Sequence, residues 1–345
     1  MNSNSNINIA TPRPAPMPVA FFGIPVGALA FAGAWRAAAR VWTIPDVIPA
    51  FLTAAALAVL LVVLVAYART WRVARAAALA ELQHPVQSSF AALVPVSALL
   101  AAQAVQVYSR DLAIALFTLG VIAQLALGVW LHGRFWQGGR KPELSTPAIY
   151  LPTVAPSFVA GTAAARLGFT QLGALFFGAG VFSWIAIESI VLHRAAVHEP
   201  LPEAMRPSLG IQLAPPVVGG VSYLAITHGV PDVFAWMLLG YGLYQALLLI
   251  RLVPWIRQRG FTPAYWAVSF GAAALPTLML RMLERGATGP LEWLAPVAFV
   301  LSNVVIGLLI AGTVRAIVRG ELLPVPAGVS SPARPINNRA AALPH

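Results

Sequence analysis

The sequence predicts an all-α protein that crosses a membrane ten times. Three observations indicate this class. Hydrophobic residues make up 59% of the 345 residues and charged residues only 10%, where soluble proteins average about 45–50% and about 25%. The mean hydropathy is +0.78. Apolar stretches of about 20 residues, which is the length that spans a bilayer, follow one another along the chain with the charges between them. This composition excludes a soluble globular enzyme, a disordered chain and a disulfide-stapled secreted domain.

Ten segments are long and apolar enough to span a bilayer, with boundaries known to within several residues. In chain order they are 18–38, 47–68, 86–108, 112–131, 147–167, 171–193, 207–227, 233–252, 263–283 and 291–314. We therefore expect one transmembrane domain over residues 17–320. Residues 1–16 are polar and lack the basic region and cleavage site of a signal peptide, and residues 321–345 are rich in Pro, Ala and Asn. We expect both to be disordered cytoplasmic tails.

The basic residues are divided unevenly between the two sides of such a bundle. The side that holds both termini carries 16 of the 22 Lys and Arg residues, and the other side carries Arg36, Arg40, Arg110, Arg166, Arg281 and Arg285. Because basic residues accumulate on the cytoplasmic side, we expect both termini to be cytoplasmic and the number of helices to be even. The net charge of +11 is then explained by loops at an anionic lipid surface, and we expect no nucleic-acid partner.

Proline recurs in the odd-numbered segments. One proline marks each of them, at spacings of 70, 57, 63 and 61 residues: Pro25, Pro95, Pro152, Pro215 and Pro276. A proline inside a helix frees a backbone carbonyl, which must be buried in protein or face water. The pattern therefore predicts five helical hairpins, with kinked odd helices lining a central pore and straight even helices outside. The alternative is that the prolines only shape a closed bundle.

Several short motifs in these segments are similar to those of one known family. Residues 22–27, 84–90, 201–216 and 265–275 carry them, including Arg206-Pro207, Ala214-Pro215-Pro216 and Ser269-Phe270-Gly271. They resemble the TehA-like tellurite-resistance/C4-dicarboxylate transporter family, which is related to plant slow-type anion channels. The resemblance covers about residues 17–320.

This resemblance implies both a fold and a function. The family's fold is ten helices in five hairpins around one pore, usually as a homotrimer, and the implied host is a bacterial inner membrane. Phe270 stands where the family carries a phenylalanine that plugs the pore, and Phe22, Phe90 and Phe158 are further candidates for apolar lining. The expected function is an anion channel or uniporter for small inorganic or organic anions, gated at Phe270. The alternatives are a proton-coupled C4-dicarboxylate transporter or tellurite/sulfite exporter, and a membrane scaffold that transports nothing.

The residues carry no known enzyme chemistry. The chain has no cysteine, no HExxH, P-loop or GxSxG motif, and no ligand spacing typical of zinc. We therefore expect no enzymatic activity, no cofactor and no metal. Glu188 is the single acid deep within a predicted span, where it is either a hydrogen-bonded structural group or a proton-coupling site. No basic residue lies in the middle of an odd segment to grip a carboxylate, which favours a channel over a coupled carrier.

Overall fold

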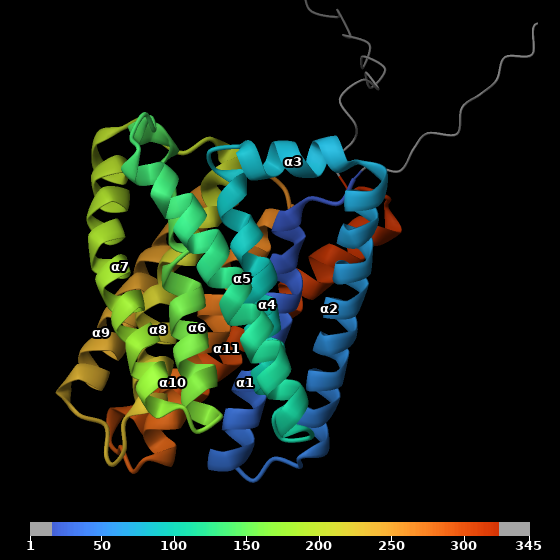
Figure 1. Cartoon of the computed structure of the whole chain (residues 1–345). Helices are drawn as coiled ribbons and strands as arrows, with labels where there is room; N and C mark the ends of the chain where they lie inside the picture. Colours follow the sequence, from blue (N-terminus) through green and yellow to red (C-terminus); the bar gives the residue numbers. More distant parts are fainter. Residues whose placement is uncertain (1–15, 324–345) are drawn as a thin grey trace, which may run out of the picture.

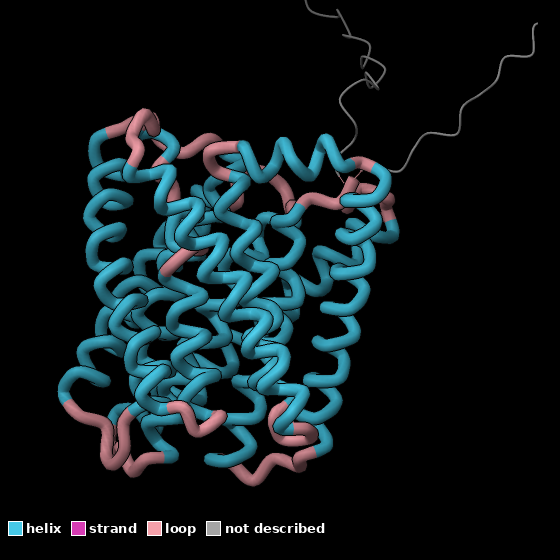
Figure 2. Tube along the Cα trace, viewed as in Figure 1, coloured by secondary structure: helices cyan, strands magenta, loops and turns pink. Residues whose placement is uncertain are grey.

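Ten helices are long and apolar enough to cross a membrane in residues 16–323, the part of the chain that the computed structural model describes (Figure 1). Short loops join them, and this range contains no β-strand (Figure 2). The fold class predicted from composition is therefore confirmed. The tails predicted at the two ends lie almost entirely outside the described residues.

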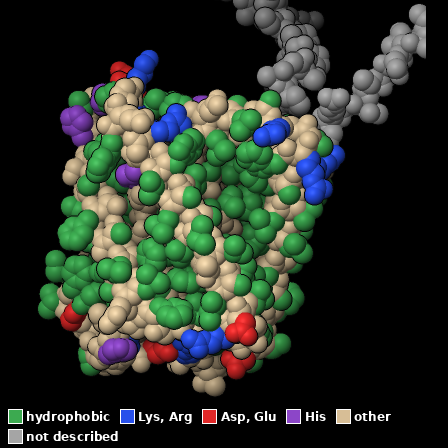
Figure 3. Space-filling model, viewed as in Figure 1, with side chains coloured by type: hydrophobic (Ala, Val, Ile, Leu, Met, Phe, Trp, Pro, Cys, Tyr) green, Lys and Arg blue, Asp and Glu red, His purple; other side chains and the backbone are tan. Residues whose placement is uncertain are grey.

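The even-numbered spans are single long α-helices on the outside. They are α2 (Val47–Val73), α5 (Arg110–Trp136), α7 (Thr170–Val197), α9 (Val233–Ile256) and α11 (Pro290–Val318). Only 28–33% of the most apolar stretch of each is buried within the protein. Figure 3 shows hydrophobic side chains over the middle of one face and charged side chains near its two ends. A surface of this kind matches the apolar core and polar boundaries of a bilayer.

The odd-numbered spans each begin as a 3-10 helix and continue as an α-helix. The pairs are η1 (Val19–Phe22) with α1 (Gly23–Val41), η2 (Gln87–Ala92) with α4 (Leu93–Val105), η4 (Pro147–Tyr150) with α6 (Val154–Arg166), η5 (Glu203–Leu213) with α8 (Ala214–Ile226), and η6 (Pro263–Val268) with α10 (Ser269–Glu284). Between 50% and 83% of their most apolar stretches is buried. These five spans are therefore the inner ones.

The inner helices form a closed ring. Helix α1 packs against α4, α4 against α6, α6 against α8, α8 against α10, and α10 again against α1. Each inner helix also packs against the outer helix that follows it in the chain. The chain thus passes around the ring as five helical hairpins.

Four of the five marker prolines lie where a 3-10 helix meets an α-helix. Pro25 and Pro95 are the third residues of α1 and α4, Pro215 is the second residue of α8, and Pro152 lies between η4 and α6. A proline in the first turn of an α-helix removes no helical hydrogen bond, because that N–H has no partner in the helix. Only Pro276 lies in a helix interior, in α10. The kinks expected within the odd helices are thus mostly changes of helix type.

A short helix that the sequence did not predict lies across one end of the bundle. This helix, α3 (Arg75–Gln83), connects α2 to η2 on the side where both described ends of the chain lie (Figure 1). The backbone N–H of Val19 donates to the Glu81 carboxylate at 3.2 and 3.3 Å, which ties α3 to the start of η1. Burial raises the pKa of Glu81, and the hydrogen bond from Val19 opposes this shift.

Candidate functional site

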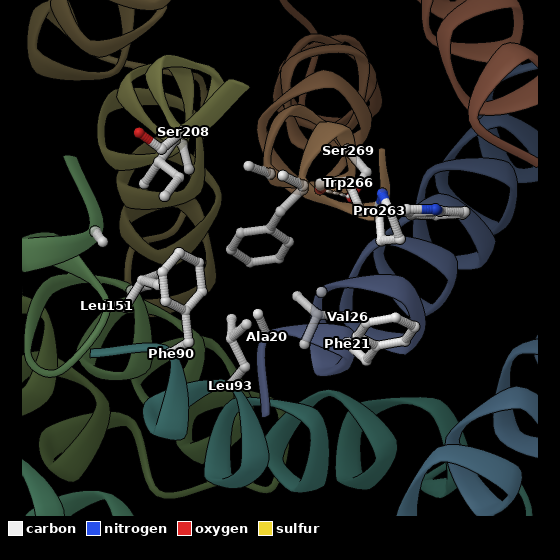
Figure 4. A pocket seen from close by; sticks show the side chains of 18 of the residues that line it. Ala20, Phe21, Val26, Phe90, Leu93, Leu151, Ser208, Pro263, Trp266 and Ser269 are labelled. Atoms are coloured by element: carbon white, nitrogen blue, oxygen red, sulfur yellow. Dashed lines mark hydrogen bonds between the residues drawn. The ribbon is translucent and has the colours of Figure 1, made fainter. Parts of the chain in front are cut away.

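A cavity of about 520 Å³ lies at the centre of the ring, between the 3-10 segments. All five inner spans contribute to its wall, as the labelled side chains from separate ribbons show in Figure 4. Residues next to both described ends of the chain, Pro18 and Leu322, also line it. This wide cavity therefore belongs to the half of the bundle on the side of the termini.

The wall of the wide cavity is mainly apolar. Phe21, Val26, Phe90, Leu93 and Leu151 surround the space in Figure 4. Among the described residues that line it, the charged ones are Arg259 and Glu321. The wall consequently offers no cluster of fixed charge that would hold an ion tightly.

A second cavity, of about 80 Å³, lies inside the same ring of helices, on the other side of Phe270. Helices α1, α4, α6, α8 and α10 line it together with Thr53 of α2. Phe270 and Val218 line both cavities. The half-buried Phe270 side chain therefore stands at the boundary between the wide and the narrow cavity.

Close backbone approaches fix the position of Phe270, the second residue of α10. A Cβ atom on Gly27 of α1 would lie 2.0 Å from Ser269 Oγ, and one on Gly210 of η5 would lie 2.7 Å from the Val268 Cα atom. Neither position accepts a larger side chain without movement of its neighbour. The Ser269 hydroxyl in turn donates to the carbonyl of Trp266 at 2.6 Å. The backbone just before Phe270 in the sequence is therefore tightly packed.

The structure places two of the three further candidate phenylalanines at the wide cavity. Phe90 and Phe158 line it. The ring of Phe22 is fully buried and packs edge-on against Tyr67 of α2 at 5.5 Å, and the adjacent Phe21 lines the cavity. Of the five marker prolines, Pro215 lines the wide cavity.

Three arginines line the narrow cavity at the end away from the termini: Arg36, Arg166 and Arg281. On α10 the lining residues are Phe270, Ala274, Thr277 and Arg281. Spacings of four, three and four residues place these side chains on one helical face, with Arg281 about 16 Å along the axis from Phe270. The sequence predicts these arginines on the side away from the termini but does not predict that they lie at one cavity. Their position near the ends of odd helices was the signal that could have done so.

Glu188 accepts hydrogen bonds from three side chains. The Tyr150 hydroxyl and the Trp184 indole N–H donate to its Oε2 atom at 2.6 and 2.8 Å, and the Tyr241 hydroxyl donates to its Oε1 atom at 2.8 Å. These donors come from η4, α7 and α9. An ionised carboxylate only accepts hydrogen bonds, so three donors suit its charged form. Tyr150 also lines the wide cavity, which connects this group to its wall.

Within residues 16–323, no group of three or more His, Cys, Asp or Glu side chains is arranged to hold a metal ion. The rings of His193 and His198 lie 6.1 Å apart at the end of α7.

Ten spanning helices, five of them in a ring around two adjacent cavities, define a polytopic membrane protein of the transporter or channel class. Comparison with known proteins identifies the family. The sequence profile of the voltage-dependent anion channel family matches residues 16–314. The chain belongs to this family.

Individual relatives agree with this assignment. The chain is similar to the tellurite resistance protein TehA homolog of Haemophilus influenzae, with 35% identity over 302 residues that cover 87% of this chain and 91% of that protein. It is also similar to two uncharacterized transporters of Methanocaldococcus jannaschii. One is 27% identical over 61% of this chain and 67% of its own length, and the other is 26% identical over 56% and 63%. The family resemblance inferred from the motifs is confirmed.

Proposed function

We propose that this protein is an anion channel or uniporter that passes small anions through the two central cavities, and that Phe270 is the gate between them. The observation that supports this most is the shared position of Phe270, which lines both the 520 Å³ cavity and the 80 Å³ cavity. An aromatic ring at such a boundary blocks ions by its volume and keeps the constriction dry.

The lining of the route favours anions over cations. Among the lining residues between 16 and 323, the one carboxylate is that of Glu321, which lies at the end of the wide cavity near the termini. Three guanidinium groups line the other end. A route without acidic groups in its middle and with basic groups at one end lowers the electrostatic energy of an anion relative to a cation. We also propose that both termini lie on the cytoplasmic side of a bacterial inner membrane, which the excess of Lys and Arg on the side of the termini supports, and that the protein assembles as a homotrimer, as the family resemblance implies.

The test is anion flux from proteoliposomes loaded with chloride or nitrate. In Phe270→Ala the ring is removed and we expect the flux to rise by at least about tenfold. Phe90→Ala is the matched control, because Phe90 is also half-buried and lines the wide cavity but does not touch the narrow one. We expect its flux to stay within about twofold of wild type. Equal effects of the two substitutions would contradict the gate.

The second candidate is a proton-coupled C4-dicarboxylate transporter or a tellurite/sulfite exporter. The observation that favours it is a carboxylate, Glu188, within a spanning helix and in contact with the cavity-lining residue Tyr150. This function requires a flux that follows an imposed pH gradient and that is abolished in Glu188→Gln. A flux that is indifferent to the pH gradient, in wild type and in Phe270→Ala, supports the channel.

A further inference from the structure

His84 lies at the turn between two helices on the side of the termini. It follows α3, which crosses that end of the bundle, and precedes η2, which continues directly into α4 (Figure 1). Its backbone is extended, with φ −69° and ψ 133°. A residue in this conformation just before a helix is placed to cap the free N–H groups of the first turn with its side chain.

His84 accepts the backbone N–H groups at the start of this inner span. Those of Val86 and Gln87 both donate to its Nδ1 atom at 3.1 Å, and that of Ser88 donates to its carbonyl at 3.1 Å. Pro85 has no N–H to satisfy. The imidazole alone therefore holds two of the three backbone donors that precede the regular part of the helix.

The segment that His84 holds is part of the wall of the wide cavity. Val86, Gln87 and Phe90 line the cavity, and so does Leu93 at the start of α4. Figure 4 shows Phe90 and Leu93 directed into the space. The position of the wall on this side thus depends on how firmly the start of η2 is fixed.

Only the neutral imidazole makes these bonds. Because Nδ1 accepts from two N–H groups, it carries no proton, and the proton of the neutral ring is on Nε2. A protonated ring has donors at both nitrogen atoms and no acceptor. Protonation would therefore leave the N–H groups of Val86 and Gln87 without their acceptor, and it would place a positive charge at the positive end of a helix.

The charged and titratable groups on the elements packed against η2 do not favour a protonated His84. On α3, on the half of α5 near this end and on η4 they are Arg75, Glu81, His132, Arg134 and Tyr150, while η1 and α4 carry none. Glu81 is the one carboxylate among them, and it already accepts from the N–H of Val19. Arg140, just after α5, donates from Nη1 to the carbonyl of Pro85 at 2.7 Å, so a charged His84 would add a second positive charge to this turn.

We propose that His84 is a positioning residue for the wide cavity that acts only in its neutral form, so that acid on the side of the termini releases the start of η2 and loosens the cavity wall. Histidine is the side chain whose charge ordinarily changes between about pH 5 and 8, and His84 is exposed to solvent. This inference goes beyond the proposed function, since it concerns the wall of the cavity whether or not an ion passes through it.

The test is hydrogen–deuterium exchange of the full-length protein at about pH 7.5 and about pH 5.5. The exchange is expressed as protection factors, which correct for the effect of pH on the intrinsic exchange rate. In wild type we expect the protection of amides 86–88, resolved by overlapping peptides, to fall by at least about tenfold at the lower pH, while the amides of α4 keep theirs. Equal protection at both pH values would overturn the proposal, and so would a loss that extends through α4, because that loss would be a general unfolding.

Two variants at position 84 separate capping from charge. In His84→Asn the Oδ1 atom stands as many bonds from the backbone as Nδ1 does, accepts N–H groups as a cap and does not titrate. Its protection should therefore stay within about twofold between the two pH values. His84→Ala has no acceptor, so it should show low protection at both.

His193→Asn is the matched control. His193 is also an exposed histidine on the side of the termini, near the end of α7, and it makes no contact with η2 in the described chain. This variant should respond to pH as wild type does. A response that persists in His84→Asn would come from another group, such as Glu81, and would overturn the role of His84, while the flux of Phe270→Ala still decides the channel.

Discussion

Glu188→Gln tests whether the intramembrane carboxylate is a structural group. In the protein, Oε2 accepts from Tyr150 and Trp184, and Oε1 accepts from Tyr241. Glutamine can place its single oxygen at the Oε2 position and keep the first two hydrogen bonds, but both become neutral. Its NH₂ group then faces the Tyr241 hydroxyl, which must turn from donor to acceptor.

The magnitude follows from the strengths of these bonds. A hydrogen bond to a charged group contributes about 1.5–3 kcal/mol, against about 0.5–1.5 kcal/mol for a neutral one. Two such bonds weakened by about 1 kcal/mol each give a loss of about 2 kcal/mol in the free energy of unfolding. Glu188→Ala leaves all three donors without an acceptor, at about 1–3 kcal/mol each, and should therefore cost about 3 kcal/mol or more.

The assay is unfolding in mixed micelles with an increasing fraction of SDS, which gives a free energy for each variant. Tyr150→Phe, made alone and together with Glu188→Gln, completes a double-mutant cycle that isolates the pairwise interaction. We expect a favourable coupling of about 1 kcal/mol between Tyr150 and Glu188. A Glu188→Gln protein as stable as wild type, with no coupling to Tyr150, would refute the structural role and leave proton transfer as the reason for the carboxylate.

Two further predictions concern the elements that hold the gate and the end of the bundle. Gly27→Ala brings a methyl group to within 2.0 Å of Ser269 Oγ, so we expect it to lower the free energy of unfolding by about 1–3 kcal/mol. Gly33→Ala on the same helix is the control, because a Cβ atom there meets nothing within 4 Å, and it should not lower the free energy of unfolding. Equal losses in the two variants would contradict the close packing at Gly27. Glu81 has a pKa above its ordinary value of 4.5, so its protonated form stabilises the fold, and this stabilisation is lost as the pH rises from about 4.5 through the raised pKa. Thermal unfolding between pH 4 and 8 should therefore show wild type losing stability relative to Glu81→Gln over that window, and parallel curves would contradict it.

The sequence predicted the ten spans because hydrophobic length is a local property. The outer helices follow that pattern closely, although α2, α5, α7, α9 and α11 extend beyond the predicted apolar ends. The 3-10 segments were not predicted, since proline restricts its own backbone and that of its neighbour but does not reveal which kind of helix precedes it. Helix α3 was missed because it is too short and too polar to resemble a span.

The candidate site was predictable only where one residue carries a motif. Phe270 was found through Ser269-Phe270-Gly271, and the structure adds its position at both cavities. The partners of Glu188 could not be predicted, because Tyr150 and Tyr241 lie 38 and 53 residues away in the chain. A contact of this kind depends on how three helices are rotated about their axes, which a spacing within one helix does not determine.

The arrangement along α10 shows why the gate and the basic end of the route can be tested independently. Phe270 and Arg281 lie on one face of the same helix but about three turns apart, with Ala274 and Thr277 between them. Substitutions separated by more than about 7–10 Å with no shared partner usually have additive effects. Phe270→Ala and Arg281→Gln should therefore change anion flux independently, and the flux of the double variant relative to wild type should equal the product of the two single effects. A double variant whose flux departs from this product would instead mean that the ring and the arginine act on the same ion.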